Sequence, residues 1–462
     1  MPRVTGASGM SRRTLLQTGA AAGLTIAGAR GLPAWAKPIA DLGRIRKPGS
    51  KPFPRMREGE DTMPEVDHII VLMMENHSFD NVLGMLPRRY RNRRDVDGLP
   101  VNRKGHPTPV NLDANGKPVR ASRAPSECQL SGRPGQNWNA SHTSWDNGRN
   151  DGFAKASGYS AMWFWDRADL PFTYSMASVF PVGDRFFCST LCQTYPNRRY
   201  LMAGTSDGVI STSDVNFQVP AKNGSIFDRL DQHKIGWRNY YTDLPATAII
   251  PGTITIPRQQ RGDFVKIDQF YSDARKGRLP AVSFVDPHFE IQSQENPQDM
   301  QFGETQAIAK VVNAVMRSPN WERTVLFFTY DEHGGYYDHV PPPKAIKPDS
   351  TPPLLGPGNT PGSFDRYGFR VPLVVVSPWA KKNYVSHQVQ DLTSILRFIE
   401  RKWNIGALTF RDANAADMTD YLDFRKAAFR DPPKLAAAPK LAPGLDRCHA
   451  LGLHPPGDPT PA

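Results

Sequence analysis

The sequence predicts an α/β fold built on a central, mostly parallel sheet, and two observations lead to this prediction. Three short apolar runs, 68–74, 324–330 and 371–377, each end in polar residues, which is typical of strands buried on both faces. Helical patterns with one apolar face accompany them, so strands and helices alternate along the chain. Ligands of such sheets bind beyond the carboxyl ends of the strands, which makes the residues after each run the candidates for a site.

The first 36 residues predict a Tat-type signal peptide. Arg12 and Arg13 precede a moderately apolar stretch, and Ala34-Trp35-Ala36 has the small-x-small pattern of a cleavage site. An ordinary amphipathic helix is the alternative. No other segment approaches the ~20 apolar residues of a membrane span. We therefore expect a mature protein without a transmembrane segment that is secreted, periplasmic or associated with the cell envelope.

Residues 37–63 are basic and punctuated by Pro and Gly, and they predict a linker before a domain over 64–425. Apolar periodicity predicts a helix in "GETQAIAKVVNAVMRSPNWE", which stops at Ser318-Pro319. A second helix is predicted in "DLTSILRFIERKW", with Asp391 as its N-cap.

The Pro-rich loop 341–365 follows the second strand, and loops of that length are typically functional lids or disordered segments. Residues 426–462 are rich in Pro and Ala and predict an extended tail. Four cysteines allow three pairings in an oxidising compartment: Cys128, Cys188, Cys192 and Cys448. Cys448 could pin the tail, and the closely spaced Cys188 and Cys192 could instead be buried and free.

The formal net charge of +12 favours anionic surfaces or substrates only weakly. No basic run is interleaved with aromatic residues, so nucleic acid is not an expected partner.

Hard oxygen ligands follow two of the predicted strands. Glu75-Asn76 comes after the first run and Asp331-Glu332 after the second. Carboxylate and amide oxygens are what Mg²⁺, Ca²⁺ or Mn²⁺ prefer, and several acids in one pocket need a cation or shared protons. The alternative is that each pair caps a loop, because spacing alone does not show that the two strands are neighbours.

Several segments, in order over roughly 65–425, resemble the phosphoesterase family of bacterial phospholipases C, plant non-specific phospholipases C and related acid phosphatases. The segments are "VLMMENHSFDNVLG", "SHTSWDNGRNDGF", "RADLPFTYSMASVFPVGDRFFCSTLCQTYPNRRYLMAGTSDG", "TYDEHGGYYDHVPPP" and "FRVPLVVVSPWAKKNYVSHQVQDLTSILRFIE". The resemblance implies an alkaline-phosphatase-like three-layer sandwich, with long loop insertions forming a lid.

The resemblance also implies roles for individual residues. The nucleophile is Thr194 in "CQTYPNRRY", with Ser189 as the nearest rival hydroxyl. His142 and His288 are expected near the leaving group and the phosphoryl oxygens. The residues expected to hold a metal ion or the phosphoryl oxygens are Glu75, Asn76, Asp331 and Glu332, and the candidates for substrate contact are His77, Asn197 and Arg198.

Elementary chemistry agrees with these roles. A threonine hydroxyl is a weak nucleophile that needs a metal or a neighbouring base. Attack on phosphorus builds charge on the equatorial oxygens, which a cation, Asn76 and imidazolium donors would stabilise, making Asn76 a catalytic candidate too. Histidine is suited to protonate the leaving alkoxide.

The chain departs from the family pattern at two positions. Asn296 stands before Pro297 where a histidine is expected, and Leu392 stands where the usual segment reads Asp-His-Thr-Ser. Acid catalysis would then fall more heavily on His142 and His288.

The leading hypothesis is an exported phospholipase C-type phosphodiesterase that hydrolyses the glycerol-phosphate ester of phosphatidylcholine-like lipids through a phosphothreonine. It would use a divalent ion (Ca²⁺, Mg²⁺, Mn²⁺ or Zn²⁺) and touch membrane surfaces transiently. The alternatives are an acid phosphatase acting on phosphomonoesters with the same site, and a catalytically silent protein that binds lipid or the cell envelope.

Overall fold

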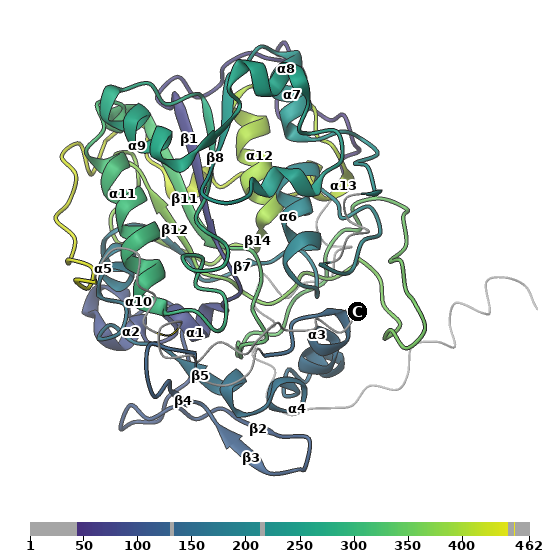
Figure 1. The fold of residues 1–462 in the computed structure, drawn as a ribbon, viewed down its shortest axis with the longest axis vertical. Helices are drawn as coiled ribbons and strands as arrows, with labels where there is room; N and C mark the ends of the chain where they lie inside the picture. Colours follow the sequence, from purple (N-terminus) through teal and green to yellow (C-terminus); the bar gives the residue numbers. More distant parts are fainter. Residues whose placement is uncertain (1–43, 130–133, 213–217, 442–447, 449–462) are drawn as a thin grey trace, which may run out of the picture. The chain divides into compact units, whose positions relative to one another are not determined.

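The computed structural model describes residues 44–129, 134–212, 218–441 and Cys448 (Figure 1). The expected signal peptide, residues 1–36, lies outside the described residues.

A central sheet of eight strands organises the described part of the chain, in the order β13-β6-β12-β11-β1-β10-β8-β9. Only β12 runs antiparallel to its neighbours, so the predicted mostly parallel sheet is confirmed. The apolar run 371–377 is therefore a buried strand as expected, but it runs in the opposite direction to the other two. The strands are β1 His68–Met74, β6 Val182–Gly183, β8 Trp237–Tyr241, β9 Phe264–Lys266, β10 Val282–Asp286, β11 Thr324–Tyr330, β12 Leu373–Val376 and β13 Val385–Ser386.

Strand β1 lies between β10 and β11 and is parallel to both. Its pairing with β11 runs in register from His68 opposite Thr324 to Met74 opposite Tyr330. The polar residues that follow β1 and β11 must consequently emerge side by side.

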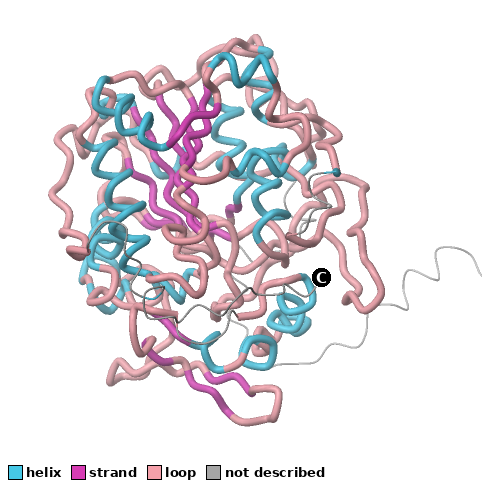
Figure 2. Tube along the Cα trace, in the orientation of Figure 1, coloured by secondary structure: helices cyan, strands magenta, loops and turns pink. Residues whose placement is uncertain are grey.

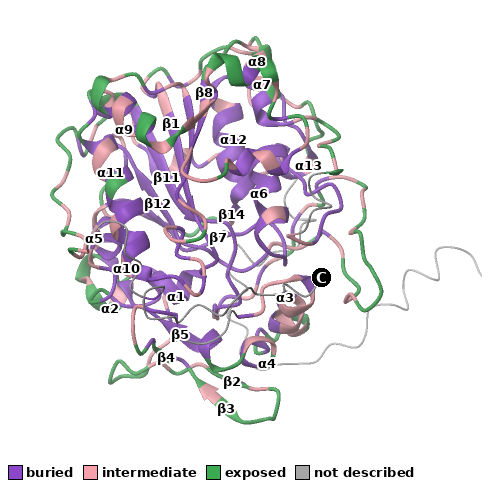
Figure 3. Ribbon diagram, viewed as in Figure 1, coloured by how far each residue is buried: buried purple, intermediate pink, exposed green. Residues whose placement is uncertain are grey.

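Helices cover both faces of the sheet, which gives three layers (Figures 1 and 2). Helices α9 (Ile267–Lys276) and α11 (Ala309–Met316) lie on one face, and α6 (Thr194–Ala203) and α12 (Leu392–Lys402) lie on the other. Both faces must therefore be apolar, and all seven side chains of β11 are buried (Figure 3).

The two predicted helices are present. The first is α10 (Met300–Gly303), a π-helical turn (Glu304–Ile308) and then α11. The second is α12, with Asp391 as its N-cap in a capping box with Ser394.

The remaining elements lie in the connections: α1 Phe79–Leu83, α2 Leu86–Arg89, β2 Val110–Leu112, β3 Pro118–Arg120, β4 Ser122–Arg123, α3 Trp138–Trp145, α4 Phe153–Ser157, β5 Trp163–Phe164, α5 Pro171–Val179, β7 Phe186–Phe187, α7 Ile226–Gln232, α8 Ile256–Arg261, β14 Gln390–Asp391 and α13 Phe410–Ala413. Short 3-10 turns join some of them, including η5 (Tyr159–Met162).

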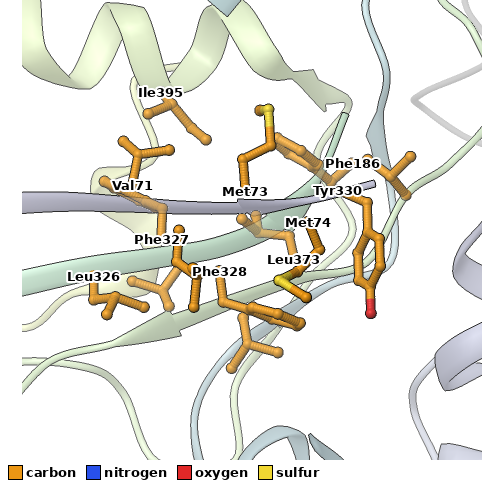
Figure 4. Close-up of a cluster of buried hydrophobic side chains, with 14 of the residues drawn as sticks. Val71, Met73, Met74, Phe186, Leu326, Phe327, Phe328, Tyr330, Leu373 and Ile395 are labelled. Carbon is orange, nitrogen blue, oxygen red and sulfur yellow. The ribbon is translucent and has the colours of Figure 1, made fainter. Parts of the chain in front are cut away.

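The core fills the space between the sheet and its helices (Figure 4). Val71 and Met73 of β1 lie on the side of Ile395 of α12, as the two-residue alternation of a strand requires. On the same side the rings of Phe327 and Phe398 pack edge to face, with centroids 5.1 Å apart.

The described part of the expected linker, residues 44–63, is fixed to the end of α12. Asn404 Nδ2 donates to the carbonyl oxygens of Phe53, Met56 and Arg57 at 3.0–3.1 Å. This segment is therefore part of the fold and not a free connection.

A disulfide joins Cys128 to Cys448, whereas Cys188 and Cys192 are free and buried. This is one of the pairings that the sequence left open, and it ties the tail to the body.

The Pro-rich loop 341–365 lies against α3. Trp138 Nε1 donates to Thr360 O at 2.7 Å, and Thr360 N donates to Asn139 Oδ1 at 2.8 Å. None of the described helices is both long and apolar enough to cross a membrane.

Candidate active site

The segments that follow β1 and β11 meet at the carboxyl edge of the sheet. Asp331 N donates to Met74 O at 3.2 Å, and Asn76 N donates to Asp331 Oδ1 at 3.0 Å. The parallel register of the two strands continues beyond their ends in this way. The structure therefore brings Glu75-Asn76 and Asp331-Glu332 together.

The close approach of the two segments depends on one glycine. Gly334 has a φ of +64°, and a Cβ added there would lie 1.8 Å from Asn76 O. Asn76 itself has a φ of +68°, a conformation that asparagine tolerates better than most residues.

Thr194 is the first residue of α6, and its side chain reaches the same edge. Its Oγ1 donates to Asn76 Oδ1 at 3.2 Å, and the residue is 5% exposed. Asn76 Nδ2 donates to Glu295 Oε1 at 3.0 Å, which orients the amide so that its oxygen faces Thr194. Glu295 was not among the sequence candidates.

The loop before Thr194 is held by Asn197, one turn into α6. Asn197 Nδ2 lies within 3.3 Å of the carbonyl oxygens of Thr190, Cys192 and Gln193, and its Oδ1 accepts from Thr190 N at 3.0 Å. Asn197 was expected to contact substrate, but its amide is taken up by the backbone of this loop.

Ser189, the rival hydroxyl, lies elsewhere in that loop. Its Oγ donates to Asp391 Oδ2 at 2.7 Å at the start of α12, and the residue is fully buried. Its hydrogen bond therefore connects the loop to α12, whereas the hydroxyl of Thr194 faces Asn76.

Arg198 lies one turn beyond Thr194 and is ion-paired to the strand-end acids. Its guanidinium is 3.2 Å from Glu75, 3.1 Å from Asp331 and 3.8 Å from Asp286. Burial lowers the pKa of Arg198, but the three carboxylates raise it by a larger amount. The net shift of this pKa is therefore upward. Arg198, expected to contact substrate, neutralises the site's own carboxylates.

Asp286 ends β10, which is the other neighbour of β1. Its Oδ2 accepts from Asn239 Nδ2 at 2.7 Å and from Ala246 N at 2.8 Å. Sequence reasoning missed this residue, although "AVSFVDPHFE" has the same pattern of an apolar run that ends in an acid.

The acids at this edge differ in their surroundings. Burial raises the pKa of Asp331, and the guanidinium of Arg198 opposes that shift. Glu332 turns toward the glycine loop, where its Oε2 accepts from Gly334 N at 2.7 Å and lies 2.9 Å from His333 Nδ1. Burial lowers the pKa of His333 to about 3, so this contact involves a neutral imidazole.

Among the residues that the structure describes, one group of three acids and histidines places its ligand atoms within 4.8 Å of one another: Asp80, Asp338 and His339. These residues could hold a metal ion, but Arg370 already lies among them. Its guanidinium is 2.8 Å from Asp338 Oδ1 and 3.1 Å from Asp80 Oδ1. The group differs from the metal ligands that the sequence predicted.

His142 lies on α3 beneath the Pro-rich loop. Its Nδ1 is 2.7 Å from Trp138 O, and because a carbonyl only accepts, Nδ1 carries the proton. Burial lowers the pKa of His142, so the ring is neutral near pH 7 with Nε2 as an acceptor. This tautomer suits a base better than the proton donor expected from the sequence.

His288 lies in the loop after β10 and remains partly exposed. Its Nδ1 accepts from Glu290 N at 3.2 Å and is 3.5 Å from Asp243 Oδ2. The next residue, Phe289, packs on the guanidinium of Arg198 at 5.1 Å, which places this loop beside the strand-end acids.

His77, a candidate for substrate contact, is fully buried. Both ring nitrogens face protein oxygens, those of Asn81 and Gln294, at 2.7 Å, and the ring stacks on Tyr336. Burial lowers its pKa to about 4. Neither nitrogen is left for a substrate, which argues against the expected role.

The two positions that depart from the family pattern are both buried. Asn296 Nδ2 donates to Tyr336 Oη at 3.1 Å, and Leu392 begins α12 with its side chain in the core. Neither side chain supplies a titratable group.

A family model described as "Phosphoesterase family" matches residues 66–406 of the chain. Non-specific phospholipase C1 of Arabidopsis thaliana is 30% identical over 406 residues, which cover 81% of this chain and 74% of the relative. Phospholipase C B of Mycobacterium tuberculosis is 29% identical over 503 residues, covering 94% and 90%. A non-hemolytic phospholipase C of Pseudomonas aeruginosa is 26% identical, covering 85% and 66%.

Among solved structures, a protein of the alkaline phosphatase superfamily from Vibrio parahaemolyticus aligns with a TM-score of 0.36 and 10% identity. The alignment covers 65% of this chain and 75% of that one.

Proposed function

Because the chain belongs to the phosphoesterase family and is a phosphoric ester hydrolase, we propose that it cleaves phospholipids as a phospholipase C, with Thr194 as its nucleophile. The bond broken is the ester between the glycerol oxygen and phosphorus. The products are diacylglycerol and a phosphorylated headgroup.

One observation carries the assignment of the nucleophile. The Thr194 hydroxyl is fixed 3.2 Å from Asn76 Oδ1, at the edge where the two acid-bearing strand ends meet. Thr194 also begins a ten-residue helix, whose N-terminus favours the negative charge of a phosphoryl group.

The reaction would proceed in two displacements. Thr194 Oγ1 loses its proton and attacks phosphorus, and the glycerol oxygen leaves and takes up a proton, so that diacylglycerol departs. Water then attacks the phosphothreonine, the phosphorylated headgroup leaves, and the proton returns to Thr194. Asn76 orients the hydroxyl and Glu295 orients Asn76.

His142 would serve as a proton acceptor in one of these steps. Its neutral ring and free Nε2 suit the removal of a proton from the attacking water. The partly exposed His288 is then the better candidate for protonating the leaving oxygen.

The strand-end residues offer the donor chemistry of a divalent cation. Glu75, Asn76, Asp331 and Glu332 supply only hard oxygen donors, and Arg198 pairs with two of these carboxylates, Glu75 and Asp331. A bound cation would stabilise the charge that develops on the phosphoryl oxygens. Arg198 would hold Glu75 and Asp331 in place toward it.

Export also belongs to the proposal. The twin arginines and the Ala34-Trp35-Ala36 pattern support a Tat-type signal, and phospholipids of a cell surface would then be within reach.

The test is ³¹P NMR of the chain incubated with phosphatidylcholine vesicles and divalent cations, beside Thr194→Ala and the matched control Ser189→Ala. Phosphocholine should form with the parent and with Ser189→Ala, and should be absent with Thr194→Ala. Turnover by Thr194→Ala above a few per cent of the parent's would overturn the nucleophile.

A second arm separates the diesterase from the phosphatase. A parent that leaves phosphatidylcholine intact but releases inorganic phosphate from phosphomonoesters would overturn the phospholipase C assignment. Exhaustive chelation, followed by metal analysis, should abolish turnover, and full activity of metal-free protein would overturn the proposed cation.

A further inference from the structure

The β2–β3 hairpin presents an apolar face that none of the described residues covers. Val110 and Leu112 of β2 are 39% and 55% exposed, whereas Asn111 between them is buried and accepts from Phe153 N of α4. The inner face of the hairpin thus packs on the body, and the outer face is apolar and open.

The register of the hairpin extends this face to β3. Val110 pairs with Arg120 and Leu112 with Pro118, and partners in an antiparallel pair project to the same side. Both Pro118 and Arg120 are exposed. Strand β3 also contacts η5, whose first residue, Tyr159, is 60% exposed.

Positive charge is concentrated in the stretch of chain that carries these apolar side chains. Between residues 102 and 120 the chain carries four basic side chains, all exposed, and one acid. That acid, Asp113, accepts from the backbone of Asn115 and Lys117 in the hairpin turn. The hairpin patch consists of Val110, Leu112, Pro118 and Tyr159 with Arg103, Lys104, Lys117 and Arg120.

The hairpin patch lies beyond the carboxyl edge of the sheet, the edge at which the candidate active-site residues gather (Figure 1). Strand β1 ends toward α1, and the hairpin lies beyond that edge, at the bottom of Figure 1. Figure 3 shows its turns as exposed, in the same region of the view. A surface that met the hairpin would face the same edge of the sheet as Thr194.

We infer that the hairpin patch docks the protein on an anionic lipid bilayer. This inference rests on the proposed function, because a phospholipase must reach a lipid surface. Exposed apolar side chains ringed by lysine and arginine are the combination that binds membrane interfaces. The apolar groups enter the acyl boundary, and the cations meet anionic headgroups. Tyr159, with an apolar ring and a polar tip, suits the same depth.

The test measures vesicle binding without turnover. Thr194→Ala is sedimented with two kinds of vesicle. One contains phosphatidylcholine alone, and the other also contains about 30% phosphatidylglycerol, whose anionic headgroups would attract the basic side chains of the hairpin patch. The anionic vesicles should bind it more tightly, and binding should weaken as salt is raised to about 0.5 M.

Two hairpin variants are made in the same background, Val110→Asp/Leu112→Asp and Lys117→Glu/Arg120→Glu. Each should lower the partition coefficient at least about tenfold. For Lys117→Glu/Arg120→Glu the reason is that a single basic residue near an anionic surface changes this coefficient about fivefold. For Val110→Asp/Leu112→Asp the reason is that a charged side chain replaces each apolar one at the acyl boundary. The matched control is Ile256→Asp, an apolar residue that is 70% exposed on α8 at the opposite end of the sheet. It should bind as the background does.

Equal binding by the hairpin variants and the background, or equal loss in Ile256→Asp, would overturn the inference. Preference of the patch for nucleic acid over anionic vesicles in a competition would also overturn it. With Thr194 present, the hairpin variants should hydrolyse monomeric short-chain phosphatidylcholine normally while turnover on bilayers falls. A parent inactive on the monomeric lipid would overturn the proposed function, whereas the vesicle measurements would still decide the docking surface.

Discussion

The hydroxyl of Thr194 and the amide oxygen of Asn76 lie 3.2 Å apart, although 118 positions separate the two residues in the chain. One begins helix α6 and the other follows strand β1, so their contact depends on how α6 packs against the sheet.

Two substitutions of Asn76 distinguish the effect of its side chain on activity from the effect of its backbone conformation on stability. Asn76→Gly and Asn76→Ala both remove the acceptor of Thr194, and we expect each to lower kcat by at least about 10²-fold. Only alanine is strained at a φ of +68°, so Asn76→Ala should be about 1 kcal/mol less stable than Asn76→Gly. Steady-state kinetics and urea unfolding measure the two effects, and equal stability of the variants would contradict the backbone argument.

Gly334→Ala should damage both stability and activity. Its new Cβ would meet Asn76 O at 1.8 Å, in addition to the strain at a φ of +64°. We expect a loss of more than about 2 kcal/mol in the free energy of unfolding. The control is Gly358→Ala, where φ is +83° but nothing lies within 4 Å, so only the strain of about 1 kcal/mol remains. Similar losses of unfolding free energy in Gly334→Ala and Gly358→Ala would contradict this, because they would show that the backbone shifts to relieve the contact with Asn76 O.

Glu304 should make the stability depend on pH. Burial raises its pKa from 4.5 to about 8, so the folded protein holds a proton that the unfolded chain releases. The contribution of this group to stability is complete below pH 4.5 and is lost at up to about 1.4 kcal/mol per pH unit between 4.5 and 8.

Glu304→Gln keeps the shape without the titration and should be flatter across that window. Chemical unfolding at pH 5, 6.5 and 8 makes the comparison. If the free energy of unfolding changed with pH equally in the parent and in Glu304→Gln, the carboxyl group of Glu304 would not be the protonated group that we expect in the folded protein.

Cys448→Ser should destabilise the protein by about 3 kcal/mol, because the disulfide to Cys128 closes a loop of 320 positions in the unfolded chain. Thermal unfolding with and without reductant measures this. Reductant should destabilise the parent and leave Cys448→Ser unchanged, and an equal response of the two proteins would point to another pairing.

The sequence identified the ends of β1 and β11 because each joins a continuous apolar run to hard oxygen ligands, which is a local signal. Their adjacency is a property of strand order, and only the register of His68 with Thr324 reveals it. The reversed direction of β12 was equally hidden, since a strand buried on both faces has the same apolar composition in either direction.

Residue roles were harder to predict than residue positions. Arg198 and Asn197 were expected to contact substrate. In the structure Arg198 pairs with carboxylates, and the side-chain amide of Asn197 bonds backbone carbonyls. Glu295 was missed because its partner Asn76 is far away in the chain, whereas Asp286 carries the local signal of an apolar run that ends in an acid. Burial, which decides the protonation of His77 and His142, is likewise set by the tertiary structure.

The bridge between Cys128 and Cys448 also determines what a protease can release. It encloses every later strand of the central sheet, together with the Pro-rich loop that lies on α3. A single cut in that loop would leave two polypeptides joined by one covalent bond. Such a nicked molecule keeps its mass on a non-reducing gel and separates into two bands only after a thiol is added.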